Sequence, residues 1–420
     1  MIIGVIGSGG REHAITKFLS FSKKVNKIYC FPGNAGTENI ATNIEIDLSE
    51  FEKLKNFIEE NKIELIVVGP EQPLVDGITD YLQKFNIKVF GPNKIASQLE
   101  GSKIFTKKLC EKYDIPTAKF GIFTSSKDTL NYLDQVNYPI VIKADNLASG
   151  KGVYICNTKD EAIVAVEEIF NGKFGEAKNI LLEEFLNGEE MSFFIITDGN
   201  TIKNFGTAQD HKRVLEGDKG KNTGGMGAYS PSRLYSSEIE KKILDRIIKP
   251  TLKGLNDLGT SYQGFLYAGL MIVNDDPYLI EYNVRMGDPE CQTILPRLKT
   301  DLFEIINSCV NADLKNSNIE WKDEKSVCVV LCSKGYPEKF EKNIEIKNLE
   351  KLKLRNNSYI FHAGTKKIQS KICATGGRVL NFVSLSENFS SARKEILENL
   401  NNLNWENGFY RKDIAHKVIK

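Results

Sequence analysis

Residues 279–290 read Leu-Ile-Glu-Tyr-Asn-Val-Arg-Met-Gly-Asp-Pro-Glu, an apolar strand that ends in a polar turn. Side chains alternate between the two faces of a strand, so we expect Glu281, Asn283 and Arg285 on one face. Carboxylate and amide oxygens suit a hard cation such as Mg²⁺, and a planar guanidinium suits a carboxylate or a phosphate. Taken alone, the pattern also fits a solvated strand face with an ordinary ion pair. The remaining sequence has to distinguish the two interpretations.

The charge of the chain argues against binding to nucleic acid or to an anionic membrane. The formal net charge is +1 over 420 residues, of which 41% are hydrophobic and 26% charged. No field of one sign therefore surrounds the whole molecule, and any phosphate must be bound locally. No apolar run approaches the roughly 20 residues of a membrane span. We expect neither nucleic acid nor a membrane as a partner.

The cysteines and the N-terminus predict a cytoplasmic protein. The eight cysteines are scattered and no Cys-x-x-Cys pair occurs, which favours reduced, buried thiols. The four histidines have no metal-ligand spacing. The first residues, Met1–Ile6, lack a basic leader and run directly into an apolar strand, so no signal peptide is predicted.

Short apolar strands alternate with amphipathic helices over the first 91 residues. This alternation is typical of a doubly wound parallel sheet. The predicted strands are Ile2–Ile6, Ile28–Phe31, Leu65–Val68 and Lys88–Phe90, and the predicted helices are Glu12–Phe21, Ser49–Asn61 and Pro73–Phe85. Ligands bind beyond the carboxyl ends of such strands, where this chain has the loops Gly7–His13, Pro32–Thr37 and Gly69–Leu74.

The first of these loops is glycine-rich but lacks a dinucleotide fingerprint. Glu12 stands where the third glycine is required, and the second strand ends at Pro32 without an acidic residue. What remains is a glycine-rich loop before a helix N-terminus, which is typical of a small-anion site. A phosphorylated sugar fits the three loops better than a dinucleotide does, although glycines that only make tight turns give the same pattern.

Two lysines and a loop of small residues indicate a nucleotide site in the middle of the chain. The apolar strand Pro139–Lys143 ends in a lysine, and residues 144–153 follow as a loop rich in small residues. It is not a Walker loop, because Gly152 follows Lys151 where serine or threonine is needed. Such a loop can still close over a triphosphate, and a solvated hairpin is the alternative. Lys103 lies in the first turn of a helix, where its charge opposes the helix dipole unless an anion is near.

The segment Glu183–Glu190 follows the next apolar strand. A strand edge at this point offers backbone donor and acceptor groups to a purine ring. Phe185 and Leu186 are placed to flank that ring, and Glu190 to accept hydrogen bonds from ribose hydroxyls. An acidic turn is the alternative interpretation.

Residues 207–232 form a long polar stretch between apolar strands. A long irregular loop in a compact enzyme is usually functional or disordered, and the mixed charges here favour contact with a substrate. Asp210 is a candidate partner for a substrate ammonium group. We expect His211 to orient its neighbours rather than to act as a base.

The chain divides into several predicted domains, as its length requires. They are an N-terminal substrate domain over residues 1–101, a central domain over 102–298 with a small mobile lid at about 122–192, a linking helix and loop over 299–325, and a C-terminal domain over 326–420 that packs on the N-terminal one. In the central domain, Ser236–Leu258 is a predicted scaffold helix, and Gly264–Val273 and Pro277–Val284 are a predicted hairpin.

Taken together, these segments resemble the ATP-grasp ligases, and among them the phosphoribosylamine–glycine ligases. The resemblance runs nearly end to end and is carried by the segments Gly7–His13, Pro32–Thr37, Gly69–Leu74, Leu99–Lys103, Val141–Val153, Glu183–Glu190, Gln209–Arg213, Asn222–Pro231, Gly264–Met271, Glu281–Gln292, Phe361–Thr365 and Arg411–Ile414. Asn146 and Ser149 depart from the glycine and alanine expected in the nucleotide loop, and Val284 and Met286 flank Arg285 where cysteine and phenylalanine are more familiar. Every charged position is kept.

The resemblance implies an α/β fold with an N-terminal doubly wound parallel sheet (pre-ATP-grasp), central ATP-grasp α+β domains and a C-terminal α/β domain. It implies a monomer that joins glycine to 5-phosphoribosylamine with ATP, through glycyl phosphate, in purine biosynthesis. The products are glycinamide ribonucleotide, ADP and phosphate. Mg²⁺ or Mn²⁺ is the implied cofactor.

The resemblance also implies a role for individual residues. Glu281 and Asn283 would hold the metal, Arg285 the glycine carboxylate and Asp210 its ammonium group. The expected ATP contacts are Lys103, Lys143, Ser149, Gly150, Gly152, Glu183, Glu184, Phe185, Leu186 and Glu190. The expected substrate contacts are Gly9, Gly10, Arg11, Asn34, Gly36, Glu71, Asp210, Lys212 and Arg285, of which Arg285, Asp210 and Lys143 are expected to be catalytic.

Three other functions remain as alternatives. Another ATP-grasp ligase or carboxylase would share the nucleotide site but lack the segment Gln209–Arg213. A nicotinamide-dependent oxidoreductase rests on the first loop alone and is disfavoured by Glu12. A non-catalytic nucleotide-binding regulator would keep Lys143 and Glu190 but has no need of the strand that carries Glu281.

Overall fold

The computed structural model describes residues 1–145, 152–173, 175 and 179–419. Its N-terminal part is a five-stranded parallel sheet with the strand order β3-β2-β1-β4-β5. The strands are β1 (Ile2–Gly7), β2 (Lys27–Pro32), β3 (Thr42–Asn43), β4 (Leu65–Val68) and β5 (Lys88–Phe90), and the helices between them are α1 (Gly10–Leu19), α2 (Phe51–Glu60), α3 (Glu71–Asp76) and α4 (Ile78–Gln83). The predicted doubly wound parallel sheet is therefore confirmed.

The three predicted helices in this part differ from the structure at their ends, and two of the differences have a clear cause. Helix α1 begins at Gly10, two residues early, because the N–H of Gly9 is capped by the carboxylate of Glu12. The predicted helix Pro73–Phe85 is two short helices that meet at Gly77. This glycine has a φ of +97°, a left-handed conformation that ends α3 and that glycine adopts without strain.

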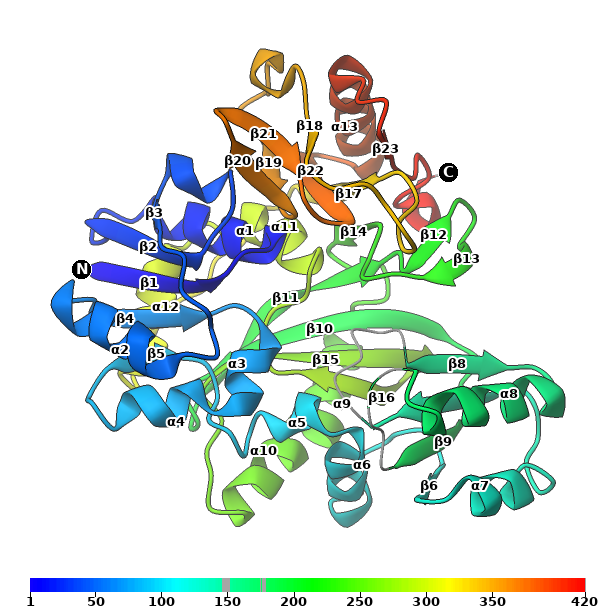
Figure 1. Ribbon diagram of the computed structural model, residues 1–420. Coiled ribbons are helices and arrows are strands. Elements are labelled where there is room, and N and C mark those ends of the chain that lie inside the picture. The colour runs from blue at the N-terminus through cyan, green and yellow to red at the C-terminus, as the bar shows by residue number, and fades with distance from the viewer. Residues whose placement is uncertain (146–151, 174, 176–178, 420) are drawn as a thin grey trace.

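The largest sheet runs through the centre of the molecule and continues into the C-terminal part (Figure 1). Its order is β16-β15-β10-β11-β14-β17-β22-β19, with β23 paired to β17. The strands are β10 (Glu189–Thr197), β11 (Ile202–Asp210), β14 (Gly227–Ser230), β15 (Gly264–Val273), β16 (Asp276–Asn283), β17 (Lys325–Ser333), β19 (Ser358–His362), β22 (Arg378–Ser386) and β23 (Gly408–Phe409). The sequence predicts packing of the C-terminal domain on the N-terminal one, but not this antiparallel pairing of β14 with β17.

A smaller four-stranded sheet lies to one side of the large one, at the lower right of Figure 1. It is formed by β6 (Phe120–Phe123), β9 (Ile180–Glu184), β7 (Ile140–Ala144) and β8 (Val153–Cys156), with α7 (Ser126–Tyr132) and α8 (Lys159–Phe170). Its buried apolar side chains form a cluster of their own, centred on Ile142, Val166 and Leu182. A separate core is what a subdomain needs if it is to move as a unit.

The remaining elements connect and cover these sheets. The helices are α5 (Gln98–Gly101), α6 (Lys103–Lys112), α9 (Ser237–Ile243), α10 (Lys249–Asp257), α11 (Glu290–Ile294), α12 (Leu302–Val310) and α13 (Phe389–Leu403), with a π-helical turn at Leu244–Ile248 and 3-10 turns at Thr37–Asn39, Leu295–Arg297, Leu314–Asn316, Leu349–Lys351 and His416–Val418. The small strands are β12 (Arg213–Leu215) with β13 (Lys219–Asn222), and β18 (Ile344–Glu345) with β20 (Thr365–Ile368) and β21 (Lys371–Ala374). Within the described residues, no helix is both long and apolar enough to cross a membrane.

The N-terminal and C-terminal parts share one hydrophobic core. Val5 and Ala14 of the first domain lie in the same buried cluster as Phe361 and Val383 of the last. The loops that end the N-terminal strands are thereby held against the centre of the molecule, where the chemically interesting side chains gather.

Candidate active site

A β-bulge in β16 sets the direction of the polar side chains of Glu281 and Asn283. Gly269 of β15 pairs with Glu281 and Leu270 pairs with Leu279, so Ile280 is an extra residue in β16. Before the bulge the buried positions are 277 and 279, and after it they are 282, 284 and 286. The bulge therefore changes which face each residue occupies. Without it, Glu281 and Asn283 would share the buried face with Leu279.

Glu281 and Asn283 are partly exposed on one face, as the alternation predicts. Among the described residues, neither side chain has a hydrogen bond or ion pair that holds its oxygens. The carbon Cγ of Glu281 lies 3.4 Å from where a side chain on Gly269 would begin, so the strand opposite leaves it room. Two oxygen donors on a single strand, without a partner among the residues that the structure describes, fit a hard divalent cation.

Lysines face these oxygens. Burial lowers the pKa of Lys103, while the Glu281 carboxylate opposes this and the Lys143 charge adds to it. The three side chains therefore lie within electrostatic reach of one another. Lys143, at the end of β7, is only 3% exposed. Its Nζ lies 2.8 Å from Oε2 of Glu183.

Glu183, an expected ATP contact, is buried between two lysines. Its side chain is 5% exposed and lies between Lys143 and Lys107. The Nζ of Lys107 lies 3.1 Å from Oε1 of Glu183. Burial opposes ionisation of this carboxyl, but the two lysines outweigh it and lower its pKa. Its backbone pairs with both β6 and β7. Glu183 thus positions two lysines, and the strand edge is left to the residues that follow it.

The remaining predicted ATP contacts have mixed placements. Phe185 and Leu186 leave the end of β9, where Phe185 is 37% exposed. Glu184 accepts a hydrogen bond from the backbone of Lys119 at 2.9 Å. The backbone oxygen of Gly152 accepts one from Ala144 at 2.9 Å. Ser149 and Gly150 lie outside the described residues, as does Asn146.

Arg285 is held by two carboxylates. Its Nε lies 3.1 Å from Glu71 and its Nη2 lies 2.6 Å from Glu100. The arginine lowers the pKa of Glu71 to about 2. Burial raises the pKa of Glu100 to about 7, although the positive charge of Arg285 acts to lower it. Glu71 is an expected substrate contact; in the structure it binds the guanidinium, and its contact with a substrate remains a prediction. Only the Nη1 edge, 3.4 Å from the backbone oxygen of Met286, is away from the carboxylates.

The predicted phosphate loop is bonded to carboxylates of the chain itself. The N–H of Gly9 donates to Glu12 at 2.6 Å, and the N–H of Arg11 donates to Asp288 at 3.2 Å. The Arg11 side chain reaches Glu12 and the backbone oxygen of Met286. Gly10 packs against the side-chain amide of Asn381. The helix N-terminus does attract anions, but here the anions are two side chains.

Asn34 joins this loop to the C-terminal part of the molecule. Its amide nitrogen donates to the backbone of Ser8 at 2.8 Å and of His362 at 2.9 Å. Its amide oxygen accepts from the N–H of Gly36 at 2.8 Å. The side chain therefore serves to order the loops, and its predicted contact with a sugar remains a prediction.

Asp210 ends β11 in a buried, acidic place. Its Oδ1 is buried and accepts no hydrogen bond from the described residues. Burial and the neighbouring charge of Glu290 raise its pKa well above the usual range. Gly225 leaves room for this oxygen, since a side chain there would begin 2.8 Å from it. A buried acceptor without a donor fits a cationic substrate group. Nearby, Nζ of Lys212 lies 2.6 Å from Oε2 of Glu190.

Four charged residues near the candidate site were given no role by the sequence patterns. They are Lys107, Glu100, Glu290 and Arg378. Lys107 could have been found from its spacing, because it lies one helical turn after Lys103 on the same face. Glu100 and Glu290 lie inside segments that carry the family resemblance. Nothing in the local sequence of Arg378 points to its contact with Asp288, 90 residues away in the chain.

The chain matches three family models along its length. They are the phosphoribosylglycinamide synthetase N domain over residues 1–100, the ATP-grasp (A) domain over 101–291 and the C domain over 326–417. The family resemblance and the fold class predicted from the sequence are both confirmed.

Curated relatives and solved structures agree with these matches. A phosphoribosylamine–glycine ligase of Mesorhizobium japonicum is 46% identical over 420 residues, which cover 100% of this chain and 99% of the relative. The corresponding ligase of Caldanaerobacter subterraneus is 44% identical over 417 residues, with 99% of each chain covered. The crystal structure of the Thermotoga maritima ligase superposes with a TM-score of 0.87 at 35% identity, covering 99% of this chain and 100% of that one.

Biotin carboxylase from Campylobacter jejuni shares the fold alone, with a TM-score of 0.71 at 16% identity over 95% of this chain and 91% of that one. With all three domain models matched, and with relatives more than 40% identical over nearly the whole of both chains, this chain belongs to the phosphoribosylglycinamide synthetase family.

Proposed function

We propose that this protein joins glycine to 5-phosphoribosylamine with ATP, forming glycinamide ribonucleotide, ADP and phosphate in purine nucleotide biosynthesis. The proposal rests mainly on one observation. In a chain that matches this ligase family end to end, Glu281 and Asn283 lie on one strand face beside Lys103, and Arg285 follows them. A site for phosphates is thereby adjacent to a site for a carboxylate.

The chemistry requires activation of a carboxylate. An ionised carboxylate resists attack by an amine because its oxygen is a poor leaving group. In the first step, a glycine oxygen bonds to the γ-phosphorus of ATP and the bond to ADP breaks. In the second, the sugar amine attacks the carbonyl carbon, phosphate leaves and the amine loses a proton. Phosphoryl transfer depends mainly on positioning and charge neutralisation.

The lysines supply much of that neutralisation. Lys103 and Lys143 face the phosphates from two elements, and Glu183 fixes the second of them through an ion pair of 2.8 Å. Lys107 shares the same carboxylate and keeps it ionised. Glu190, which pairs with the expected substrate contact Lys212, contacts the nucleoside end of ATP.

Glu281 and Asn283 would hold Mg²⁺ or Mn²⁺. Their oxygens suit either ion, and the bulge at Ile280 directs both side chains away from the buried face. The bound ion would supply positive charge to the phosphate oxygens and orient them.

Glycine is bound between a cation and two carboxyl groups. Its carboxylate takes the Nη1 edge of Arg285, because Glu71 and Glu100 already occupy Nε and Nη2. Its ammonium group supplies the hydrogen bond that the buried Oδ1 of Asp210 lacks. Glu290 lies beside Asp210 and adds a second negative charge, which favours an amino acid over bicarbonate.

Phosphoribosylamine binds at the ends of the N-terminal strands, around Gly9–Arg11, Asn34 and Gly36. The N–H groups of Gly9 and Arg11 are held by carboxylates, so its phosphate has to exchange with one of them or bind to the Arg11 side chain.

The domain division predicted from the sequence is part of the same proposal. Residues 122–192 act as a lid, which is supported by the separate core of the four-stranded sheet. The protein acts as a monomer in the cytoplasm. Its eight cysteines all lie in the described part of the chain and are buried and free, which suits a reducing compartment.

An omission assay tests the function. ADP formation is measured by a coupled assay with phosphoribosylamine generated in situ, and each of ATP, glycine and phosphoribosylamine is left out in turn. We expect ADP release to require all three, and bicarbonate to fail as a replacement for glycine. Release with bicarbonate, or without the sugar amine, would assign the chain to a different ATP-grasp reaction.

A further inference from the structure

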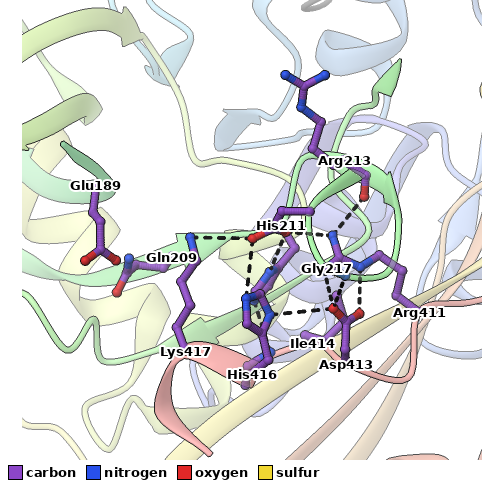
Figure 2. Close-up of polar contacts among 12 residues, drawn as sticks. Glu189, Gln209, His211, Arg213, Gly217, Arg411, Asp413, Ile414, His416 and Lys417 are labelled. Carbon is purple, nitrogen blue, oxygen red and sulfur yellow. Dashed lines mark hydrogen bonds and ion pairs between the residues drawn. The ribbon is translucent and has the colours of Figure 1, made fainter. Parts of the chain in front are cut away.

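The C-terminal segment Arg411–Lys417 is bonded to the loop that follows Asp210, about 200 residues earlier in the chain (Figure 2). Arg411 is 1% exposed, and its Nη1 donates to the backbone oxygen of Arg213 and to Oδ1 of Asp218, both at 2.9 Å. The rest of its guanidinium pairs with both oxygens of Asp413, at 2.8 and 2.7 Å. A buried arginine with this many partners fixes the relative position of two segments.

Further contacts extend the link along the β12–β13 hairpin. The carboxylate of Asp413 accepts the N–H of Gly217 at 2.8 Å. The N–H of Lys412 donates to the Glu216 side chain at 3.1 Å. These contacts and the bond from Arg411 to Asp218 lie at the turn of the hairpin, and the bond from Arg411 to Arg213 lies at its start, so the hairpin is held at two places.

His211 is the point where this link reaches the site. Its Nε2 accepts the N–H of Ala415 at 3.0 Å, so the proton of the neutral ring lies on Nδ1, which faces Oδ1 of Asp218 at 3.4 Å. Burial keeps the ring neutral by lowering its pKa. The orientation and the tautomer of His211 are both set by the C-terminal segment and the hairpin.

The same side chains could be interpreted as a metal site, but their bonds argue against it. His211, Asp218 and His416 bring three ligand atoms within 4.8 Å of one another. Both ring nitrogens of His211 are already used, and the cations of Arg411 and Lys417 lie 2.9 and 3.7 Å from Asp218. A metal ion would have to displace these bonds and meet two positive charges. The cluster is better explained as a structural link.

The neighbours of His211 in the chain are two residues of the proposed site. The backbone of His211 bonds to Gly227 and Met226, both at 2.8 Å, which holds this part of the chain extended against β14. Side chains of an extended segment alternate in direction. Asp210 and Lys212 therefore point away from the C-terminal segment, toward Glu290 and Glu190.

We propose that the segment Arg411–Lys417 positions the site by fixing His211 and the β12–β13 hairpin behind Asp210 and Lys212. The inference rests on the proposed function, because it assigns Asp210 to the ammonium group of glycine. Asp413, Arg411 and His211 are positioning residues: they touch no substrate. Loss of their contacts lets Asp210 shift, and a shift of about 1 Å is enough to weaken a substrate contact strongly.

Steady-state kinetics of Asp413→Ala test this inference. We expect the KM for glycine to rise about tenfold, with a smaller change in kcat. Asp413→Asn keeps the shape and one acceptor oxygen, so its KM should lie between those of the wild type and the alanine variant. Lys371→Ala removes an exposed ion pair with Glu345 in the C-terminal part and is the control, with an unchanged KM.

A second variant, Glu216→Ala, tests the same inference if Asp413→Ala does not fold. Glu216 is exposed, and Glu216→Ala removes only the acceptor of the Lys412 N–H, so we expect a folded enzyme with a glycine KM raised about two- to fourfold. A wild-type glycine KM in every folded variant of the link would overturn the inference. If the wild type itself made no ADP with glycine, the proposed function would fail instead, so the two failures are distinguishable.

Discussion

At the scale of single residues, Arg285 shows how a charged group is prepared for a substrate. Two carboxylates hold its guanidinium in place before any ligand is bound. One of them, Glu100, is buried, and burial raises its pKa to about 7. Removing the arginine would leave this carboxyl without its partner, so the arginine orders the site as well as offering its Nη1 edge to the proposed substrate.

Arg285→Lys should therefore impair the use of glycine more than the use of ATP. Lysine keeps the charge but cannot bind Glu71, Glu100 and a substrate carboxylate at once. We expect kcat/KM for glycine to fall about a hundredfold, which corresponds to about 2.7 kcal/mol, and the KM for ATP to change little. Arg246→Lys, in an exposed pair with Asp276 at the start of the same strand, is the matched control. An unchanged KM and kcat for glycine in Arg285→Lys would remove it from the glycine site.

At the scale of elements, Glu183 connects three of them. It lies on β9, and its carboxylate joins Lys143 of β7 to Lys107 of α6. The contacts of Lys143 and Lys107 are thus tied to the junction between the four-stranded sheet and the helix beside it. The same carboxylate serves the fold and the proposed nucleotide site.

Glu183→Gln should destabilise the protein. The substitution leaves two buried ammonium groups without a counter-charge, and breaking a buried pair in this way costs about 3–5 kcal/mol. Urea unfolding followed by circular dichroism measures the loss. Asp257→Asn, which breaks the exposed pair with Lys253, should have little effect. If the two variants unfolded at the same urea concentration, the buried carboxylate would not have the role described here.

The elements also show what the sequence could and could not predict. Strands such as Leu65–Val68 and Gly264–Val273 have the predicted bounds, because their apolar runs end at clear turn residues. The bulge at Ile280 has no signal of its own, since an extra residue in a strand shows only in its pairing with β15. The split at Gly77 could have been suspected from the glycine, but the amphipathic pattern continues through it.

Within the site, the sequence predicted which residue types gather but not how they pair. Asp210, Lys143 and Arg285 were found from local pattern and family resemblance. That Glu71 binds Arg285, 214 residues away, depends on the packing of two domains. Glu12 shows this most clearly. Its presence argued against a dinucleotide site, but the sequence did not predict that its carboxylate would accept the N–H of Gly9 in the glycine-rich loop.

At the scale of the whole molecule, a pair of histidines joins the first domain to the last. Nδ1 of His13, in α1, accepts the N–H of His362, in β19, at 2.8 Å. The two rings lie 5.6 Å apart. Burial, with a contribution from the other ring and from Lys17, lowers the pKa of His13 to about 3, and burial lowers the pKa of His362 to about 4. Both rings are neutral in the folded protein over most of the pH range.

This interface should weaken in mild acid. An unfolded histidine takes up a proton near pH 6.5, whereas these two resist it in the folded state. The unfolded state therefore binds more protons below pH 6.5, and stability falls as the pH drops from about 6.5 to 4. The slope is up to about 1.4 kcal/mol per pH unit for each ring, and the contribution is fully present above pH 6.5.

Urea unfolding at several pH values checks this expectation. His13→Asn keeps an acceptor for the His362 N–H but does not titrate, so its stability should fall less steeply below pH 6.5 than that of the wild type. Comparison of the two proteins removes the background from carboxyl groups, which titrate in both. Parallel curves between pH 6.5 and 4 would show that His13 is not a source of the acid sensitivity.

The central claim is that glycine is activated as an acyl phosphate before the amine attacks. Glycine labelled with ¹⁸O in its carboxylate tests this most directly, with mass spectrometry of the inorganic phosphate released in the presence of ATP and phosphoribosylamine. We predict one ¹⁸O atom in each phosphate, because the glycine oxygen that bonds to phosphorus leaves with it. Unlabelled phosphate formed together with glycinamide ribonucleotide would contradict the account.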